Sequence, residues 1–164
     1  MGDANQSNSG IFHLQSTQNP PSGPPEVRAN QTLLAVTQYE WLNEEGVSAK
    51  IVSRPESVTV TDIQSCWPQL RIKFSTSTKP AVLIVGLFTE LDMDGFPELD
   101  SEIHIDVFDS PHSSVDFNQD SISVLVDEVT PVKYAVIRAA FIHFTPESLK
   151  GQISTASWVM RFAD

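Results

Sequence analysis

Hydrophobic and polar residues alternate along much of the chain after Thr32. The alternation has a period of two residues, which is typical of β-strands that bury one face and expose the other. We therefore predict a half-buried strand in each segment that shows it. These segments are residues 58–61, 70–75, 102–107, 121–126 and 155–162.

Other segments break this alternation. Residues 81–85 and 134–137 are apolar on both faces, as expected of central strands covered on both sides. Residues 33–41 and 47–53 also suit strands, joined by a turn at residues 43–46. The apolar residues of 33–41 fit a short helix equally well.

Helix is otherwise scarce in the pattern. Residues 146–151 begin with Pro and end with Gly, which predicts one helical turn. Many short strands separated by turns favour an all-β fold, namely an antiparallel β-sandwich. About eight or nine strands suit a jelly roll better than a seven-stranded immunoglobulin-type fold. We predict a β-sandwich domain over residues 32–164.

Residues 1–31 have a different composition. They are rich in Asn, Gln and Pro, which favours extended backbone without a core of its own. Ile11, Phe12 and Leu14 form a small apolar island in this segment. We predict an extended N-terminal arm that is either flexible or docked on a partner through these three residues.

The composition restricts the class of protein to which this chain can belong. The chain has 164 residues, of which 40% are hydrophobic, so it is long enough for one domain with a core. One Cys excludes an intramolecular disulfide and a Cys-rich zinc site. No apolar run resembles a signal-peptide core or a membrane span, so we expect a virion or cytoplasmic protein that is not secreted through a signal peptide.

The charge is strongly acidic and unevenly distributed. The chain carries 10 Lys and Arg against 21 Asp and Glu, a net charge of −11, and Arg28 is the one Lys or Arg of its N-terminal arm. We therefore expect no nucleic-acid binding by the arm. No Lys or Arg lies between Lys79 and Lys133, where twelve acids fall. Such a run is either solvated, neutralised by a cation or met by a basic partner.

Two pairs of carboxylates in this run are candidate calcium ligands. Asp92 and Asp94 precede a Gly, and Asp106 and Asp109 stand near a strand end. Calcium needs six to eight oxygen ligands, so one loop would have to be completed by another loop or subunit. The alternative is a solvated acidic loop without metal.

Motifs for catalysis are weak. His104 and Asp106 share one face of a predicted strand, but no nucleophile motif accompanies them. The sequence therefore predicts a protein that is not an enzyme. An exposed Trp41, Trp67 or Trp158 would suit stacking on a sugar ring, although Trp158 lies on a predicted core face.

The whole pattern resembles small jelly-roll viral coat or capsid-associated proteins. The resemblance is carried by the Pro-, Asn- and Gln-rich arm, the run of strands, and a last strand over residues 156–162 close to the chain end. It implies calcium held between subunits by an Asp-x-x-Asp pair, a spacing that Asp106 and Asp109 have. The arm departs from the basic, RNA-binding arm common in such proteins.

We therefore predict a non-enzymatic structural protein. It would assemble with itself, or with other capsid subunits, through its arm and sheet edges. The alternative is a β-sandwich binding module for carbohydrate or for a basic protein partner. A hydrolase that uses two acids of the 90–109 segment is the third candidate.

Overall fold

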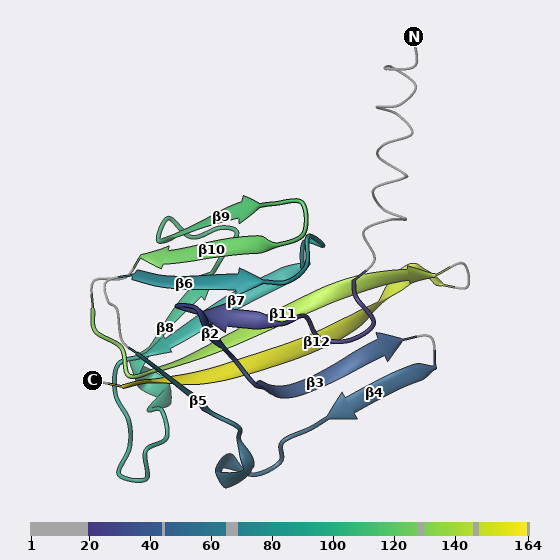
Figure 1. The fold of residues 1–164 in the computed structure, drawn as a ribbon. Helices are drawn as coiled ribbons and strands as arrows, with labels where there is room; N and C mark the ends of the chain where they lie inside the picture. Colours follow the sequence, from purple (N-terminus) through teal and green to yellow (C-terminus); the bar gives the residue numbers. More distant parts are fainter. Residues whose placement is uncertain (1–19, 44, 65–68, 128–129, 146–147, 164) are drawn as a thin grey trace.

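The protein is a sandwich of two β-sheets in the computed structural model, which describes residues 20–43, 45–64, 69–127, 130–145 and 148–163 (Figure 1). Apart from strands, these residues form two short 3-10 turns, η1 (Pro55–Ser57) and η2 (Leu99–Ser101). The predicted all-β antiparallel sandwich is confirmed. The described part of the chain contains no helix with the length and hydrophobicity that a membrane span requires.

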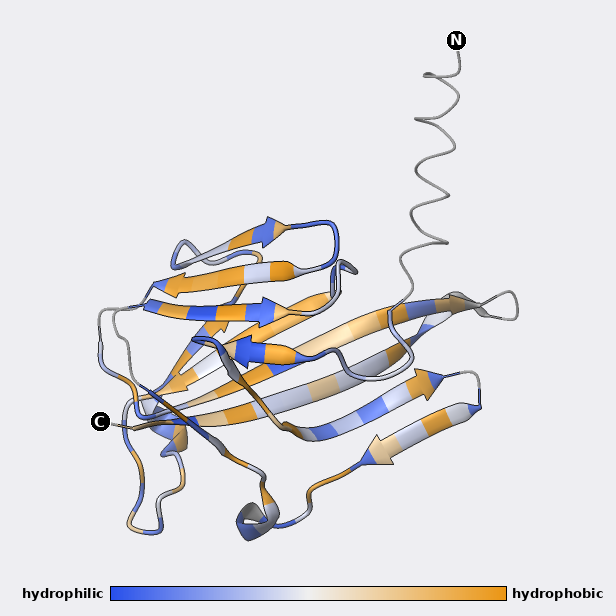
Figure 2. Ribbon diagram, viewed as in Figure 1, coloured by the Kyte–Doolittle hydropathy of each residue, from blue (hydrophilic) through white to orange (hydrophobic). Residues whose placement is uncertain are grey.

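One sheet has five strands in the order β2-β1-β6-β10-β9, and every pairing is antiparallel. Apolar and polar residues alternate along β6 and β10 (Figure 2). One face of each strand is therefore buried in the core. The strands are β1 (Val27–Ala29), β2 (Thr32–Leu33), β6 (Gln69–Phe74), β9 (Ser113–Phe117) and β10 (Ile122–Asp127).

The other sheet has seven strands, six of them in the order β4-β3-β12-β11-β7-β8. The seventh, β5, pairs in parallel with the end of β12. Residues 81–85 are largely apolar, and β7 is accordingly coloured apolar over most of its length in Figure 2. The strands are β3 (Val36–Asn43), β4 (Gly46–Lys50), β5 (Thr61–Gln64), β7 (Val82–Phe88), β8 (Glu102–Asp106), β11 (Tyr134–Thr145) and β12 (Ser148–Ala163).

The core lies between the two sheets and contains large aromatic side chains. Trp158 of β12 meets Phe74 of β6 edge to face, with ring centroids 5.9 Å apart. Trp41 of β3 packs on Phe141 of β11 at 5.5 Å, and its indole N–H donates to the carbonyl oxygen of Pro21 at 2.8 Å. Both Trp side chains are buried, as packing of aromatic surface predicts.

The strand order does not confirm the jelly-roll topology. Consecutive strands pair as hairpins within a sheet, namely β3–β4, β7–β8, β9–β10 and β11–β12. The helical turn predicted over residues 146–151 is wrong, because β12 begins at Ser148. Residues 33–41 do not form a helix, because Val36 begins β3. The strand expected at 58–61 instead begins at Thr61.

Strand β1 lies within the range 1–31 that was predicted to be the arm. Val27 and Ala29 are fully buried, and β1 pairs with β6 over three residues. Residues 27–31 are therefore part of the sandwich in this structure. The arm candidates Ile11, Phe12 and Leu14 lie outside the described residues.

Candidate functional site: the open face of the large sheet

The outer face of the seven-stranded sheet is uncovered at one end. Residues 81–85 were expected to be covered on both sides, but Val82 is 43% exposed and Ile84 is half-buried. The strand register explains which side chains share this face. Val82, Ala140, Thr155 and Glu40 form one row across β7, β11, β12 and β3, and Ile84, Arg138, Ser157 and Gln38 form the next.

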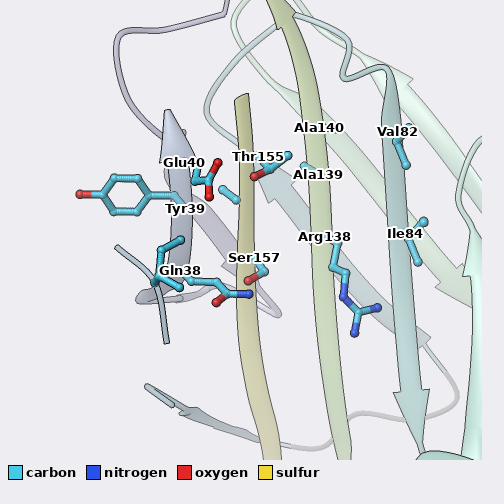
Figure 3. A pocket seen from close by; sticks show the side chains of 12 residues that line it. Gln38, Tyr39, Glu40, Val82, Ile84, Arg138, Ala139, Ala140, Thr155 and Ser157 are labelled. Atoms are coloured by element: carbon cyan, nitrogen blue, oxygen red, sulfur yellow. The ribbon is translucent and has the colours of Figure 1, made fainter. Parts of the chain in front are cut away.

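These two rows line a shallow hollow of about 510 Å³. Its middle carries the small side chains of Ala140, Thr155 and Ser157, which leave room between larger neighbours on the outer strands. Figure 3 shows Thr155 and Ser157 on β12 between Gln38 on β3 and Arg138 on β11. The hollow is therefore a consequence of side-chain size rather than of a gap in the sheet.

Exposed apolar side chains lie on this sheet face, and two of them, Ile51 and Val82, line the hollow itself. We call this surface the open face and define it by six residues, more than half of the ten large apolar residues that are exposed in the described chain. Monomeric proteins rarely leave so many apolar side chains together in water, and such patches mark interaction surfaces. The six residues are Val47, Ile51, Val82, Ile142, Phe144 and Ile153.

The opposite end of the same sheet face is covered by the chain itself. Val58 and Val60, which precede β5, pack against Phe88, Tyr134 and Val159. Burial raises the pKa of the Tyr134 hydroxyl, and the nearby charge of Arg161 opposes this shift. The contrast shows what a covered sheet face looks like in this protein, and the open face lacks such a cover among the described residues.

The open face carries charges of both signs. Glu40 is exposed on β3, and Arg138 on β11 lies 3.9 Å from Glu102 with half of its side chain in water. Strands in a sheet are about 4.8 Å apart and rise about 3.4 Å per residue, so these two residues, which flank β12 in neighbouring rows, lie roughly 12 Å from each other. The face therefore carries Glu40 on one side of β12 and the Arg138–Glu102 ion pair on the other.

Calcium at Asp92 and Asp94 stays a prediction, and the structure shows that Asp92 also holds a turn. The Asp92 carboxylate accepts the backbone N–H groups of Asp94 and Phe96, both at 2.9 Å. These bonds close the turn that contains Gly95, whose φ is +86°. The sequence signal of Asp before Gly is therefore explained by turn geometry.

The second pair lies at the other end of β8. Asp106 and Asp109 line a hollow of about 460 Å³ together with Lys79, whose ammonium lies 4.7 Å from the centre of the Phe108 ring. Asp106 is the last residue of β8, whereas the turn at Asp92 precedes the first, so the length of this strand separates the two pairs. Within the described ranges, no three potential metal ligands come together.

Candidates for catalysis or sugar binding are not assembled into a site in the described chain. His143 and Ser154 are 2.6 Å apart, but Ser154 is fully buried beneath the sheet. Trp41 and Trp158 are buried and cannot stack on a ligand, while Trp67 lies outside the described residues. His104 shares an exposed face of the edge strand β8 with Asp106, as predicted.

Comparisons with known proteins assign the chain to no family. No family model matches the chain, and neither the curated proteins nor the solved structures contain a match. What the fold defines is a class: a two-sheet, almost entirely antiparallel β-sandwich with one uncovered apolar face.

Proposed function

We propose that this protein is a non-enzymatic structural subunit that associates with copies of itself through the open face. The observation that carries the proposal is the group of exposed apolar side chains on an otherwise regular sheet. Burying them against a partner gains roughly 25 cal/mol for each Å² of apolar surface removed from water. The resemblance to viral coat proteins makes a shell subunit the specific form that we propose.

The face suits a second copy because it is self-complementary. In a two-fold arrangement, the same patch of each copy meets the other. Glu40 of one copy can then face Arg138 of the other, while the apolar residues of both copies meet around them. This places the main contact on a sheet face, in addition to the arm and the sheet edges that the sequence suggested.

A binding module is the second candidate function. The hollow of about 510 Å³ on the open face favours it, because concave apolar surfaces with a few polar groups are typical of ligand sites. Its carbohydrate form lacks exposed Trp side chains in the described chain. A monomer whose fluorescence changes on adding ligand would support this candidate.

The variant Ile153→Lys tests the proposal. Ile153 is 66% exposed in the single chain, so Lys fits there without unfolding the protein. In an interface, however, the buried ammonium would lack a partner. We expect wild-type protein to exceed the 18.1 kDa of one chain in light scattering, and the variant to associate about tenfold or more weakly.

Phe117→Lys is the matched control. Phe117 is 51% exposed but belongs to β9, at the edge of the other sheet. This variant should associate as wild type does. A wild-type protein that stays at 18.1 kDa at high concentration, or equal effects of the two variants, would contradict the proposal.

Calcium at Asp106 and Asp109 stays a prediction of the sequence. Two carboxylates beside Lys79 supply too few oxygens for calcium, so a second copy would have to provide the others. Such a shared site requires the mass of the assembly to fall when calcium is removed with EDTA. An equal mass in calcium and in EDTA would remove the metal from the proposal.

A further inference from the structure

The outer face of the five-stranded sheet carries a cluster of bases. Arg28 on β1 stands directly opposite Lys73 on β6, and Arg71 lies two residues before Lys73. All three side chains are exposed. We call this surface the basic face. It holds three of the ten Lys and Arg of a chain whose net charge is −11.

This arrangement is unfavourable in the isolated chain. Like charges directly opposite each other on paired strands destabilise a sheet. The Arg28 guanidinium donates to the Gln31 carbonyl oxygen, at 3.3 Å, and that of Arg71 donates to the Gln69 side chain, also at 3.3 Å. Among the described residues, none of the three bases forms an ion pair. These hydrogen bonds orient the two Arg side chains without neutralising them.

The basic face is also hollowed. A depression of about 560 Å³ is lined by the three bases and by polar and apolar residues of β9 and β10, including Ser114, Ser123 and Leu125. Leu33 on β2, the cross-strand partner of Arg28, adds an apolar side chain that is 48% exposed. The surface thus offers positive charge and apolar contacts together.

The loop between β7 and β8 carries the opposite charge and also exposes apolar side chains. We call residues 89–101 the acidic loop. Asp94, Glu98 and Asp100 are exposed there, and Met93 and Leu99 are among the most exposed apolar residues in the described chain, Leu99 at 80%. Internal bonds hold its shape, since the Asp92 N–H donates to the Phe96 carbonyl oxygen at 2.7 Å. A loop that is already ordered loses little entropy on docking.

We propose that the acidic loop of one copy docks on the basic face of the next. Figure 1 shows the loop between β7 and β8 hanging below the seven-stranded sheet, on the far side from the five-stranded sheet. One molecule therefore cannot make this contact with itself. The contact is head to tail, and it builds rings or filaments rather than closed pairs.

A nucleic acid is a weaker fit to the same surface. Three bases are few for a phosphate backbone, and Asp116, which also lines the depression, opposes any anionic partner there. The acidic loop supplies carboxylates together with the apolar side chains that Leu33 and Leu125 can meet. The proposal rests on self-association as the proposed function but uses a different surface from the open face.

Complementary charge reversal tests the proposal in the Ile153→Lys background, where the open face is blocked. One variant adds Arg71→Glu and Lys73→Glu, and the other adds Asp94→Lys and Glu98→Lys. All four positions are exposed, so folding should persist, which circular dichroism checks. Each variant alone should associate at least about tenfold more weakly than the Ile153→Lys parent at low salt. A mixture of the two should recover the association, because each reversed surface then meets its opposite.

Salt provides the second readout. Raising ionic strength from about 0.01 to about 1 M shortens the Debye length from roughly 30 to 3 Å, and should dissociate the parent. A mixture that stays monomeric, or a parent whose association neither reversal weakens, would overturn the proposal.

The same experiment separates the two proposed contacts. If the Ile153→Lys parent is monomeric while wild type assembles, the proposal of the charged contact is wrong and that of the open face stands. If Ile153→Lys assembles like wild type, the open face fails instead. A further outcome is that the parent does not self-associate but binds a single-stranded oligonucleotide, and that Arg71→Glu/Lys73→Glu abolishes this binding. This result would assign the basic face to nucleic acid.

Discussion

At the scale of single residues, His143 is a buried polar group held by contacts from two neighbouring strands. It is buried beside Trp41, whose ring lies edge to face with it at 5.9 Å, and it shares a hydrogen bond with Ser154. The Ser154 hydroxyl oxygen also accepts the backbone N–H of Leu42 at 2.9 Å. These bonds join β3, β12 and β11 at one end of the large sheet, and burial lowers the pKa of His143 below its usual 6.5.

This lowered pKa predicts a pH-dependent stability. Between the folded pKa and 6.5, the unfolded chain binds more protons at this position than the folded one. The contribution of His143 to stability is therefore fully present above pH 6.5 and is lost as pH falls through the folded pKa. Urea unfolding of wild type and His143→Gln across this range measures it, and the variant should show the smaller pH dependence. Equal slopes would contradict the prediction.

Ser154 gives a second prediction at this scale. Ser154→Ala leaves the buried His143 ring and the Leu42 N–H without their shared partner, so stability should fall by about 1–3 kcal/mol at neutral pH. Ser75→Ala is the control, because the Ser75 hydroxyl accepts the Glu26 N–H in an exposed hydrogen bond. Chemical unfolding should show a much smaller loss in the control. A Ser154→Ala protein as stable as wild type would assign the network no structural role.

At the scale of elements, the β11–β12 hairpin forms the centre of the large sheet. Its paired residues run from Tyr134↔Arg161 to Thr145↔Ser148. The sequence predicted only residues 134–137 and 155–162, because Ala139–Phe144 is largely apolar on both faces and shows no period. Pairing with β12 gives these residues their structure, and Ala139 and Ala140 also pair with β7. The missed strand β9 is similar, since its polar Ser113–Phe117 becomes a strand by pairing with β10.

Gly151 tests how tightly this hairpin is built. Its φ is +78°, and an added Cβ would lie 2.7 Å from Ile142 Cγ2 and 3.2 Å from the His143 carbonyl oxygen. We expect Gly151→Ala to lower stability by at least about 1–2 kcal/mol. Gly23→Ala is the matched control, because open space surrounds Gly23 and its φ is ordinary. Similar unfolding midpoints for the two variants would contradict this packing.

At the scale of the whole molecule, the two sheet faces differ in kind. The five-stranded sheet presents bases to solvent, and the seven-stranded sheet presents apolar side chains around a hollow. The proposed contacts use both, one as a self-complementary pair and one head to tail. The two-fold contact alone ends at a dimer, and the head-to-tail contact is the one that extends the assembly.

The boundary of the sandwich yields a prediction at this scale. Deleting residues 1–31 removes β1, and with it the buried Val27 and Ala29, so this truncation should unfold far more easily than wild type. Burial of a Val side chain alone is worth about 1.5–3 kcal/mol. Deleting residues 1–19 removes none of the described sandwich and should leave its unfolding midpoint unchanged. Equal stability of the two truncations would contradict this boundary.

The shorter truncation also tests the arm. If Ile11, Phe12 and Leu14 dock on a neighbouring copy, deleting residues 1–19 should weaken assembly while the fold stays intact. Light scattering on this truncation separates the two effects, which the longer deletion would confuse. Assembly equal to that of wild type would remove the arm from the proposed function.

The sequence by itself determined the class of this fold. Alternation at period two identified β6, β8 and β10 and the second half of β12, because one buried face imposes that pattern wherever strands pair. It also identified the acidic run, which is a property of composition alone. It could not give the strand order, because period two says which face is buried but not which strand lies beside it.

Tertiary structure alone decided what each surface presents. Val82 and Val85 are equally apolar in the sequence, yet Val82 lies on the open face and Val85 in the core. Arg28 and Lys73 are 45 positions apart, and only the pairing of β1 with β6 brings their charges together. The exposure of a side chain depends on which segments from elsewhere in the chain pack against its strand. The sequence of the strand itself does not specify those segments.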